Sequence, residues 1–277
     1  MRYISQPVNA FDNADVNSVA ELEETVEGNY YQNNASGQQV YQGGYNHVIL
    51  DNNGNPLAFY YRDNRMNGYE YDYGLRYSRR VDGQWQTPEW IEDRVEVTDI
   101  AAAIRSDGGI FVAYTVKDLP DFISSNDTLY SVVKYAEQID VVTGIDEDGN
   151  DIHEWQWETG FVNYNTISGA YLTVALDEDD LPVVAYYDEM NMQMNRFFSR
   201  LKVSRRTAEG DWEIYVVNPE DVGLSNNTSY YDALPPGSSD KHYIGKYNYL
   251  WFDPQGRINL VSYSTVNKKV FLFQMDD

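Results

Sequence analysis

Hydrophobic and polar positions alternate in short blocks along most of the chain, and one order of blocks occurs four times. Its clearest copy is LDEDDLPVVAYYDE at residues 176–189, in which an apolar residue, an acidic turn and a second apolar run follow one another. Related blocks begin at Leu50, Ile104 and Phe252. Short apolar runs around an Asp/Asn/Gly turn are typical of β-hairpins, so each block predicts two antiparallel strands.

Two further strands are expected after each hairpin. In the first unit the pattern predicts strands at residues 45–50, 57–61, 75–80 and 85–92. Repeated meanders of four short strands are the sequence signature of propeller blades. We expect the blades to cover residues 45–92, 96–165, 168–218 and 245–277.

The spacing inside the units supports a true repeat. Fourteen residues separate Tyr61 from Leu75 in the first unit, and fourteen separate Tyr187 from Leu201 in the third. The turn positions of successive units lie 54, 72 and 76 residues apart. These steps exceed the about 40–50 residues of common propeller repeats, which indicates long inserted loops.

The last unit has only three predicted strands. Residues 1–9, MRYISQPVN, resemble the fourth strand of the third unit and are expected to complete the last blade, which would close the ring and leave no open sheet edge. Residues 10–44 are interpreted as a long connection. The prediction is therefore an all-β, four-bladed propeller in a single domain, residues 1–277, with five blades as the alternative if residues 20–44 form a degenerate one.

The recurring order of apolar strand, Asp-rich turn, apolar strand, Tyr-Tyr-Asp and a strand ending at Gly-x-Trp resembles the bacterial extracellular β-propeller repeats related to the sialidase-like BNR group. The resemblance covers most of residues 45–277 and implies the fold alone. The Asp-box of that group reads Ser-x-Asp-x-Gly-x-Thr-Trp, whereas residues 106–111 read SDGGIF. The catalytic residues of a sialidase cannot be assigned here, so its activity is not carried over.

The formal net charge of −24 excludes nucleic acid and anionic lipid as expected partners, because a strongly negative field repels both. The chain contains no cysteine, which removes disulfides and thiolate sites. No apolar run approaches the about 20 residues of a membrane span, and the N-terminus lacks the apolar core of a signal peptide. The expected location is extracellular, at the cell surface or periplasmic; the composition gives no oligomeric state.

Several conspicuous residues are assigned structural roles. The turn acids Asp51, Asp177 and Asp253 are expected to cap their turns by accepting backbone N–H groups. The two Ser-Arg-Arg sequences are expected to form ion pairs with neighbouring blades through Arg79, Arg80, Arg205 and Arg206. Trp85 and Trp212 recur at one place in their units, which predicts packing between sheets.

One turn carries candidate metal ligands. Asp146, Asp148 and Asn150 supply closely spaced oxygen atoms of the kind that calcium prefers, although the spacing departs from that of an EF-hand. The alternative is a solvated hairpin tip. The three histidines are scattered, so no zinc site is predicted, and no other cofactor is expected.

The strongest candidate for a binding surface is the face that carries the long loops. Those loops are rich in Tyr, Asn, Asp and Met, and tyrosine combines a flat apolar ring with a polar tip that suits recognition of sugars or proteins. The candidate ligand-binding residues are Asp63, Tyr69, Tyr71, Asp72, Tyr73, Asp188, Tyr230, Tyr231 and His242.

The sequence therefore favours a non-catalytic, lectin-like recognition module for a carbohydrate or protein ligand. Two alternatives stay open. One is a glycan-active hydrolase or lyase with carboxylates such as Asp63, Asp72 or Asp188 in a central funnel. The other is a structural subunit of a surface assembly. An enzyme requires convergent acids with at least one raised pKa, whereas a lectin requires a shallow site floored by aromatic rings.

Overall fold

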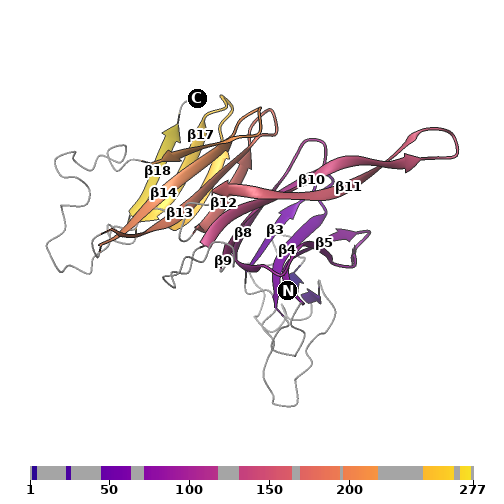
Figure 1. Cartoon of the computed structure of the whole chain (residues 1–277), viewed down its shortest axis with the longest axis horizontal. Coiled ribbons are helices and arrows are strands. Elements are labelled where there is room, and N and C mark those ends of the chain that lie inside the picture. The colour runs from indigo at the N-terminus through magenta and orange to yellow at the C-terminus, as the bar shows by residue number, and fades with distance from the viewer. Residues whose placement is uncertain are drawn as a thin grey trace, which may run out of the picture. The chain divides into compact units, whose positions relative to one another are not determined.

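A computed structural model describes nine stretches of the chain, residues 2–4, 23–25, 45–63, 72–117, 131–163, 169–193, 196–217, 246–264 and 269–275 (Figure 1). All regular elements in these stretches are β-strands. Four antiparallel sheets follow one another along the chain, which confirms the predicted all-β fold class with the sheets of a four-bladed propeller. None of the described residues forms a helix long and apolar enough to cross a membrane.

The chain separates into two compact units, Met1–Val95 and Glu96–Asp277. The first unit contains the first blade, whose strands are β3 (Asn46–Leu50), β4 (Pro56–Asp63), β5 (Tyr73–Val81), β6 (Gln84–Trp85) and β7 (Glu89–Asp93). Both β6 and β7 pair with β5, so the fourth strand expected at residues 85–92 is split in two. Pro88 lies in the gap, and a proline cannot donate a backbone hydrogen bond to the ladder.

The second unit contains three blades. The second blade comprises β8 (Glu96–Ile104), β9 (Ile110–Lys117), β10 (Ser131–Ile145) and β11 (Asp151–Asn163). The third comprises β12 (Ala170–Leu176), β13 (Pro182–Gln193), β14 (Arg196–Arg206) and β15 (Trp212–Val216). The fourth comprises β16 (Lys246–Phe252), β17 (Ile258–Ser264) and β18 (Lys269–Met275). Within each blade, strands that are consecutive in the chain pair with one another.

The predicted closing strand is corrected by the structure. β1 (Arg2–Ile4) pairs with β2 (Glu23–Thr25) in a separate two-stranded sheet, while the described part of the fourth blade has three strands. The sequence pattern of a short strand does not specify its partner. Pairing within the N-terminal segment closes a much shorter loop than pairing with the far end of the chain, so it costs less conformational entropy.

The third blade is buried on both of its faces. Val184 and Tyr186 of β13 pack against the second blade, together with Phe111 and Val133. Val183 and Ala185, which point to the opposite face, pack against residues of the fourth blade. This double burial explains why VVAYY is a continuous apolar run instead of an alternating one.

The turn acids have the structural role that the sequence predicts. Oδ1 of Asp177 accepts the backbone N–H groups of Asp179 at 3.0 Å and Leu181 at 2.8 Å. Asp51 and Asp253 make the same pair of bonds in their own turns. Trp212 lies against Phe111 and Tyr135 of the second blade, with ring centroids 6.2 and 5.7 Å apart, as expected for packing between sheets.

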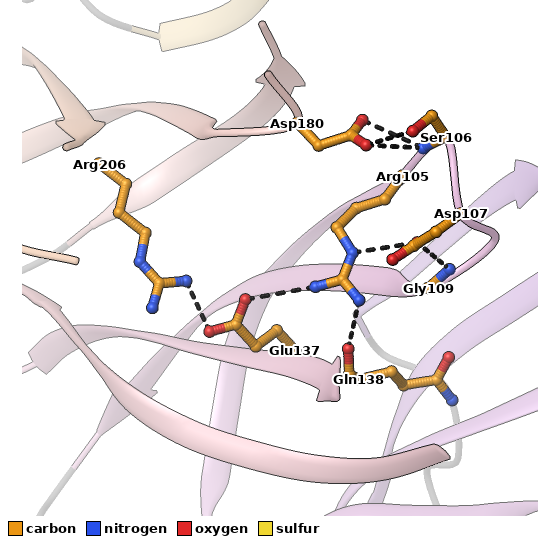
Figure 2. Close-up of polar contacts among 8 residues, drawn as sticks. All are labelled: Arg105, Ser106, Asp107, Gly109, Glu137, Gln138, Asp180 and Arg206. Atoms are coloured by element: carbon orange, nitrogen blue, oxygen red, sulfur yellow. Dashed lines mark hydrogen bonds and ion pairs between the residues drawn. The ribbon is translucent and has the colours of Figure 1, made fainter. Parts of the chain in front are cut away.

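A polar network joins the second and third blades at their hairpin ends (Figure 2). Glu137 of β10 forms ion pairs with Arg206 of the third blade at 2.5 Å and with Arg105 of its own blade at 3.6 Å. The pair with Arg206 confirms the predicted ion pairing between blades for this arginine. Arg105 also donates to the backbone oxygen of Gln138 at 2.6 Å.

Candidate functional site

Three of the predicted ligand-binding residues lie together in the first blade. Asp63, at the end of β4, is paired in register with Tyr73 of β5 and accepts a hydrogen bond from the Tyr61 hydroxyl at 3.1 Å. Asp72 forms an ion pair with Arg62 at 2.7 Å, and the Arg62 side chain is only 5% exposed. Both acids are therefore engaged by neighbours in their own blade, which favours a structural role for them.

The remaining predicted ligand-binding residues are placed only in part. The backbone of Asp188 in β13 pairs with Arg200 of β14. Five predicted residues lie outside the described stretches, namely Tyr69, Tyr71, Tyr230, Tyr231 and His242. A shared binding surface that includes them stays a prediction.

The candidate calcium turn has a capping role in the structure. Oδ1 of Asp146 accepts the backbone N–H groups of Asp148 at 2.9 Å and Asn150 at 2.8 Å. Hydrogen bonds from Asn150 lower the pKa of Asp146. Among the described residues, no group of three or more His, Asp or Glu side chains is arranged to hold a metal ion. Calcium binding at this turn stays a prediction.

The structure brings together a group of residues that the sequence prediction did not select. Four tyrosines, here named the tyrosine cluster, gather at one end of the third and fourth blades, namely Tyr171, Tyr187, Tyr247 and Tyr263. The rings of Tyr171 and Tyr247 have centroids 4.9 Å apart. Tyr187 meets Tyr171 edge-on at 6.2 Å, and Tyr263 lies 6.3 Å from Tyr247. Such tilted and edge-on contacts are the favourable arrangements of aromatic rings.

The backbone at two of these tyrosines is unusual. Tyr171 and Tyr247 have positive φ angles of 58° and 54°, in the left-handed region that a bulky residue rarely adopts. Each lies at a register shift, between Ala170 and Thr173 in β12 and between Lys246 and Tyr249 in β16. A β-bulge changes the direction of a side chain, and such costly local geometry is concentrated at functional sites.

A chain of polar contacts holds the first bulge in place across three blades. Asp99 of β8 accepts the backbone N–H of Leu172 at 3.1 Å. The Asn248 side chain of β16 donates to the backbone oxygen of Tyr171 at 3.1 Å. Because the first strands of the three blades pack beside one another, these bonds fix the Tyr171 backbone from both sides.

The carboxyl group of Asp99 has a raised pKa. Burial causes the increase, and hydrogen bonds from the backbone of Leu172, Ile100 and Tyr171 oppose it. Both carboxylate oxygens already accept backbone N–H groups, from Ile100 at 2.8 Å and from Leu172 at 3.1 Å. Asp99 is therefore a structural anchor of the cluster, and its geometry does not suit a proton donor aimed at a ligand.

The outer part of the cluster is accessible. Tyr247 is 67% exposed, whereas Tyr187 is buried and Tyr171 and Tyr263 are half-buried. The arrangement supplies an exposed aromatic surface supported by buried rings. The sequence contains a pattern from which the cluster could have been found. The first strands of the third and fourth blades both carry tyrosine as their second residue, in AYLT and KYNY.

No protein-family model matches the chain, and no curated protein matches its sequence. Two similar solved structures are the polysaccharide lyase Uly1, with 10% identity, and an exo-1,5-α-L-arabinanase from a bovine ruminal metagenomic library, with 8% identity. Each covers 83% of this chain with a TM-score of 0.36. The aligned region spans about half of the lyase (49%) and 73% of the arabinanase.

Proposed function

We propose that this protein is a non-catalytic recognition module that binds a carbohydrate at the tyrosine cluster. The observation that carries the proposal is the exposed ring of Tyr247 lying 4.9 Å from that of Tyr171, with both residues held at strained bulges. Strain of this kind costs of order 1–3 kcal/mol at each residue. The fold alone does not require it, since the first blade begins its sheet without a register shift and the second blade has one, between Val97 and Asp99, without a positive φ.

The chemistry of the cluster suits a sugar. Tyrosine offers an apolar ring against which the C–H face of a pyranose can pack, and a hydroxyl that can exchange hydrogen bonds with sugar hydroxyls. The net charge of −24 disfavours sulfated or uronic acid glycans. We therefore propose a neutral or amino sugar as the ligand and a site of action outside the cytoplasm, where such glycans are displayed.

A glycan-active enzyme is the second candidate, and Asp99 is the observation that bears on it. Hydrolysis of a glycosidic bond requires two carboxyl groups about 5–10 Å apart. Asp99 has a raised pKa, but its oxygens are occupied by backbone N–H groups. This favours binding over catalysis for the tyrosine cluster.

The test is a screen of the full chain on an array of neutral and amino glycans, followed by calorimetry with the glycan that gives the highest signal. We expect Tyr247→Ala to weaken binding about tenfold or more, which corresponds to about 1.4 kcal/mol. Tyr215→Ala is the matched control, because Tyr215 is also exposed, at 42%, but lies on the outermost strand of the third blade.

Three results would contradict the proposal. Failure to bind any glycan would exclude carbohydrate recognition and leave a protein ligand. Equal losses in Tyr247→Ala and Tyr215→Ala would place the site elsewhere. Release of new reducing ends or unsaturated products from a bound glycan would show catalysis.

A further inference from the structure

One hairpin extends well beyond the sheet to which it belongs. β10 pairs with β9 only through Ser131–Glu137, yet β10 continues to Ile145 and remains paired with β11. Residues 139–145 and 151–157, with the turn between them, are here named the β-arm. Figure 1 shows the β-arm as a two-stranded ribbon that projects past the other strands of the second blade.

The blade itself does not need this extension. The corresponding hairpins of the first and third blades turn directly after Val81 and Arg206. The tip of the β-arm uses the same turn as the hairpin after Arg206: the N–H of Gly149 bonds to the oxygen of Asp146, as that of Gly210 bonds to the oxygen of Thr207. The extra length is therefore an addition to the blade, and a two-stranded ribbon is only marginally stable in water on its own.

The β-arm exposes large apolar side chains. Val142, Ile145 and Trp155 are 52%, 67% and 42% exposed. Residues directly opposite one another in a ladder share a face, and the pairs Asp140 with Trp155, Val142 with His153, and Ile145 with Asp151 place these three on the same face. An apolar row on an unsupported ribbon is typical of a contact surface.

The backbone edge of the β-arm is also open. Arg105 donates to the backbone oxygen of Gln138, the first residue of β10 beyond its pairing with β9. From residue 139 to residue 145, none of the described strands pairs with this edge of β10. An open edge of this length can accept an extended peptide as an additional strand.

The charge of the β-arm indicates which kind of partner can bind it. The β-arm, residues 139–157, contains six Asp and Glu residues and no Lys or Arg. A second copy of this chain, with its net charge of −24, would be repelled. A complementary partner is therefore basic, with apolar side chains that reach the row formed by Val142, Ile145 and Trp155.

We propose that the β-arm is a docking element for a partner protein, which adds an extended segment of alternating basic and apolar residues to the open edge. Two contacts hold in place the face of the β-arm that would bind this partner segment, the face that carries Trp155. Arg105 lies 5.8 Å from the Trp155 ring, and His153 Nδ1 lies 2.8 Å from Asp140 Oδ2. This site is separate from the tyrosine cluster, so either proposal can fail alone.

The probe for the test is a synthetic peptide of alternating lysine and isoleucine, titrated into the full chain. An all-lysine peptide and an alternating glutamate–isoleucine peptide are the controls. Intrinsic tryptophan fluorescence reports binding, since Trp155 and Trp157 both lie in the β-arm. We expect salt-sensitive binding of the Lys–Ile peptide at least about tenfold tighter than that of either control.

Substitutions locate the site. Ile145→Ser combined with Val142→Ser should reduce the affinity for the Lys–Ile peptide about tenfold or more. Val270→Ser with Leu272→Ser is the matched control, because these residues are 66% and 63% exposed on β18. Circular dichroism checks that each variant remains folded.

Three outcomes would overturn the proposal. Equal affinity for the Lys–Ile and all-lysine peptides would show non-specific charge attraction. Equal losses in the two double variants would place the site elsewhere. Self-association of the chain in sedimentation experiments that the β-arm substitutions abolish would assign the β-arm to a second copy instead.

Discussion

Asp180 of the third blade accepts hydrogen bonds from the backbone N–H of Ser106 at 3.0 Å and from the Ser106 hydroxyl at 2.5 Å. Asp180 has a positive φ of 61°. In the other described hairpins with the same turn bonds, this position is glycine, as at Gly54, Gly108 and Gly256. The turn of the third blade therefore keeps a strained residue whose side chain joins it to the second blade (Figure 2).

The contribution of this contact can be measured by a double-mutant cycle. We expect Asp180→Ala to lower the free energy of unfolding by about 1–2 kcal/mol, since it removes acceptors and since alanine tolerates the left-handed region less well than aspartate. Ser106→Ala should cost about 0.5–1 kcal/mol, with a coupling energy of about 0.5 kcal/mol or more. Asp179→Ala, which removes an exposed carboxylate from the same turn, is the control. Additive losses would contradict a direct interaction.

Substitution of Glu137 should destabilise the contact between the second and third blades more than substitution of Asp180 does. Its side chain is 11% exposed, and its partners Arg105 and Arg206 are 16% and 19% exposed. Glu137→Ala leaves both guanidinium groups without this carboxylate, so we expect a loss of about 2–4 kcal/mol in the free energy of unfolding. Glu158→Ala on β11 of the same blade, where the side chain is exposed, is the control for chemical denaturation. A loss below about 0.5 kcal/mol would show that Glu137 does not hold the blades together.

The turn carboxylates predict a specific pH dependence. Burial alone would raise the pKa of Asp51, but hydrogen bonds from Asn55 and Asn53 outweigh it, so the pKa lies below the usual 3.8. A group with a lowered pKa in the folded state stabilises the fold above its unfolded pKa, and this stabilisation is lost as the pH falls through the folded value.

The variant Asp51→Ala tests this sign. The difference in free energy of unfolding between the natural protein and the variant should be largest at about pH 7 and should shrink below about pH 3. Asn52→Ala in the same turn keeps the carboxylate and controls for the loss of a side chain. A difference that does not change with pH would contradict a role for the ionised form.

The fold could be predicted from the sequence because its determinants are local and repeated. Asp51, Asp177 and Asp253 each cap a tight turn within five residues of chain, and the apolar runs after them fix the second strand of each blade. The partner of residues 2–4 could not be predicted, because a three-residue strand carries no information about which edge it joins.

The candidate site was harder to predict, because it depends on backbone geometry and contacts between blades. Tyr171 and Tyr247 are 76 residues apart, and alternation alone does not reveal the bulges that bring their rings together. Asp99 looks like an ordinary strand residue until its bonds to the third blade are seen. The binding surface was predicted at the long loops because of their composition. Two of the residues chosen there, Asp63 and Asp72, instead bind Tyr61 and Arg62 of their own blade.

The most direct test of the tyrosine cluster is nuclear magnetic resonance of ring-labelled tyrosine during titration with the glycan that the array identifies. Single Tyr→Phe variants assign the signals. Binding at the cluster should shift the ring signals of Tyr171, Tyr247 and Tyr263, while the exposed Tyr45 and Tyr215 remain unchanged. Shifts at Tyr61 and Tyr73 of the first blade, with the cluster unaffected, would contradict the proposed site and return the binding surface to the first blade.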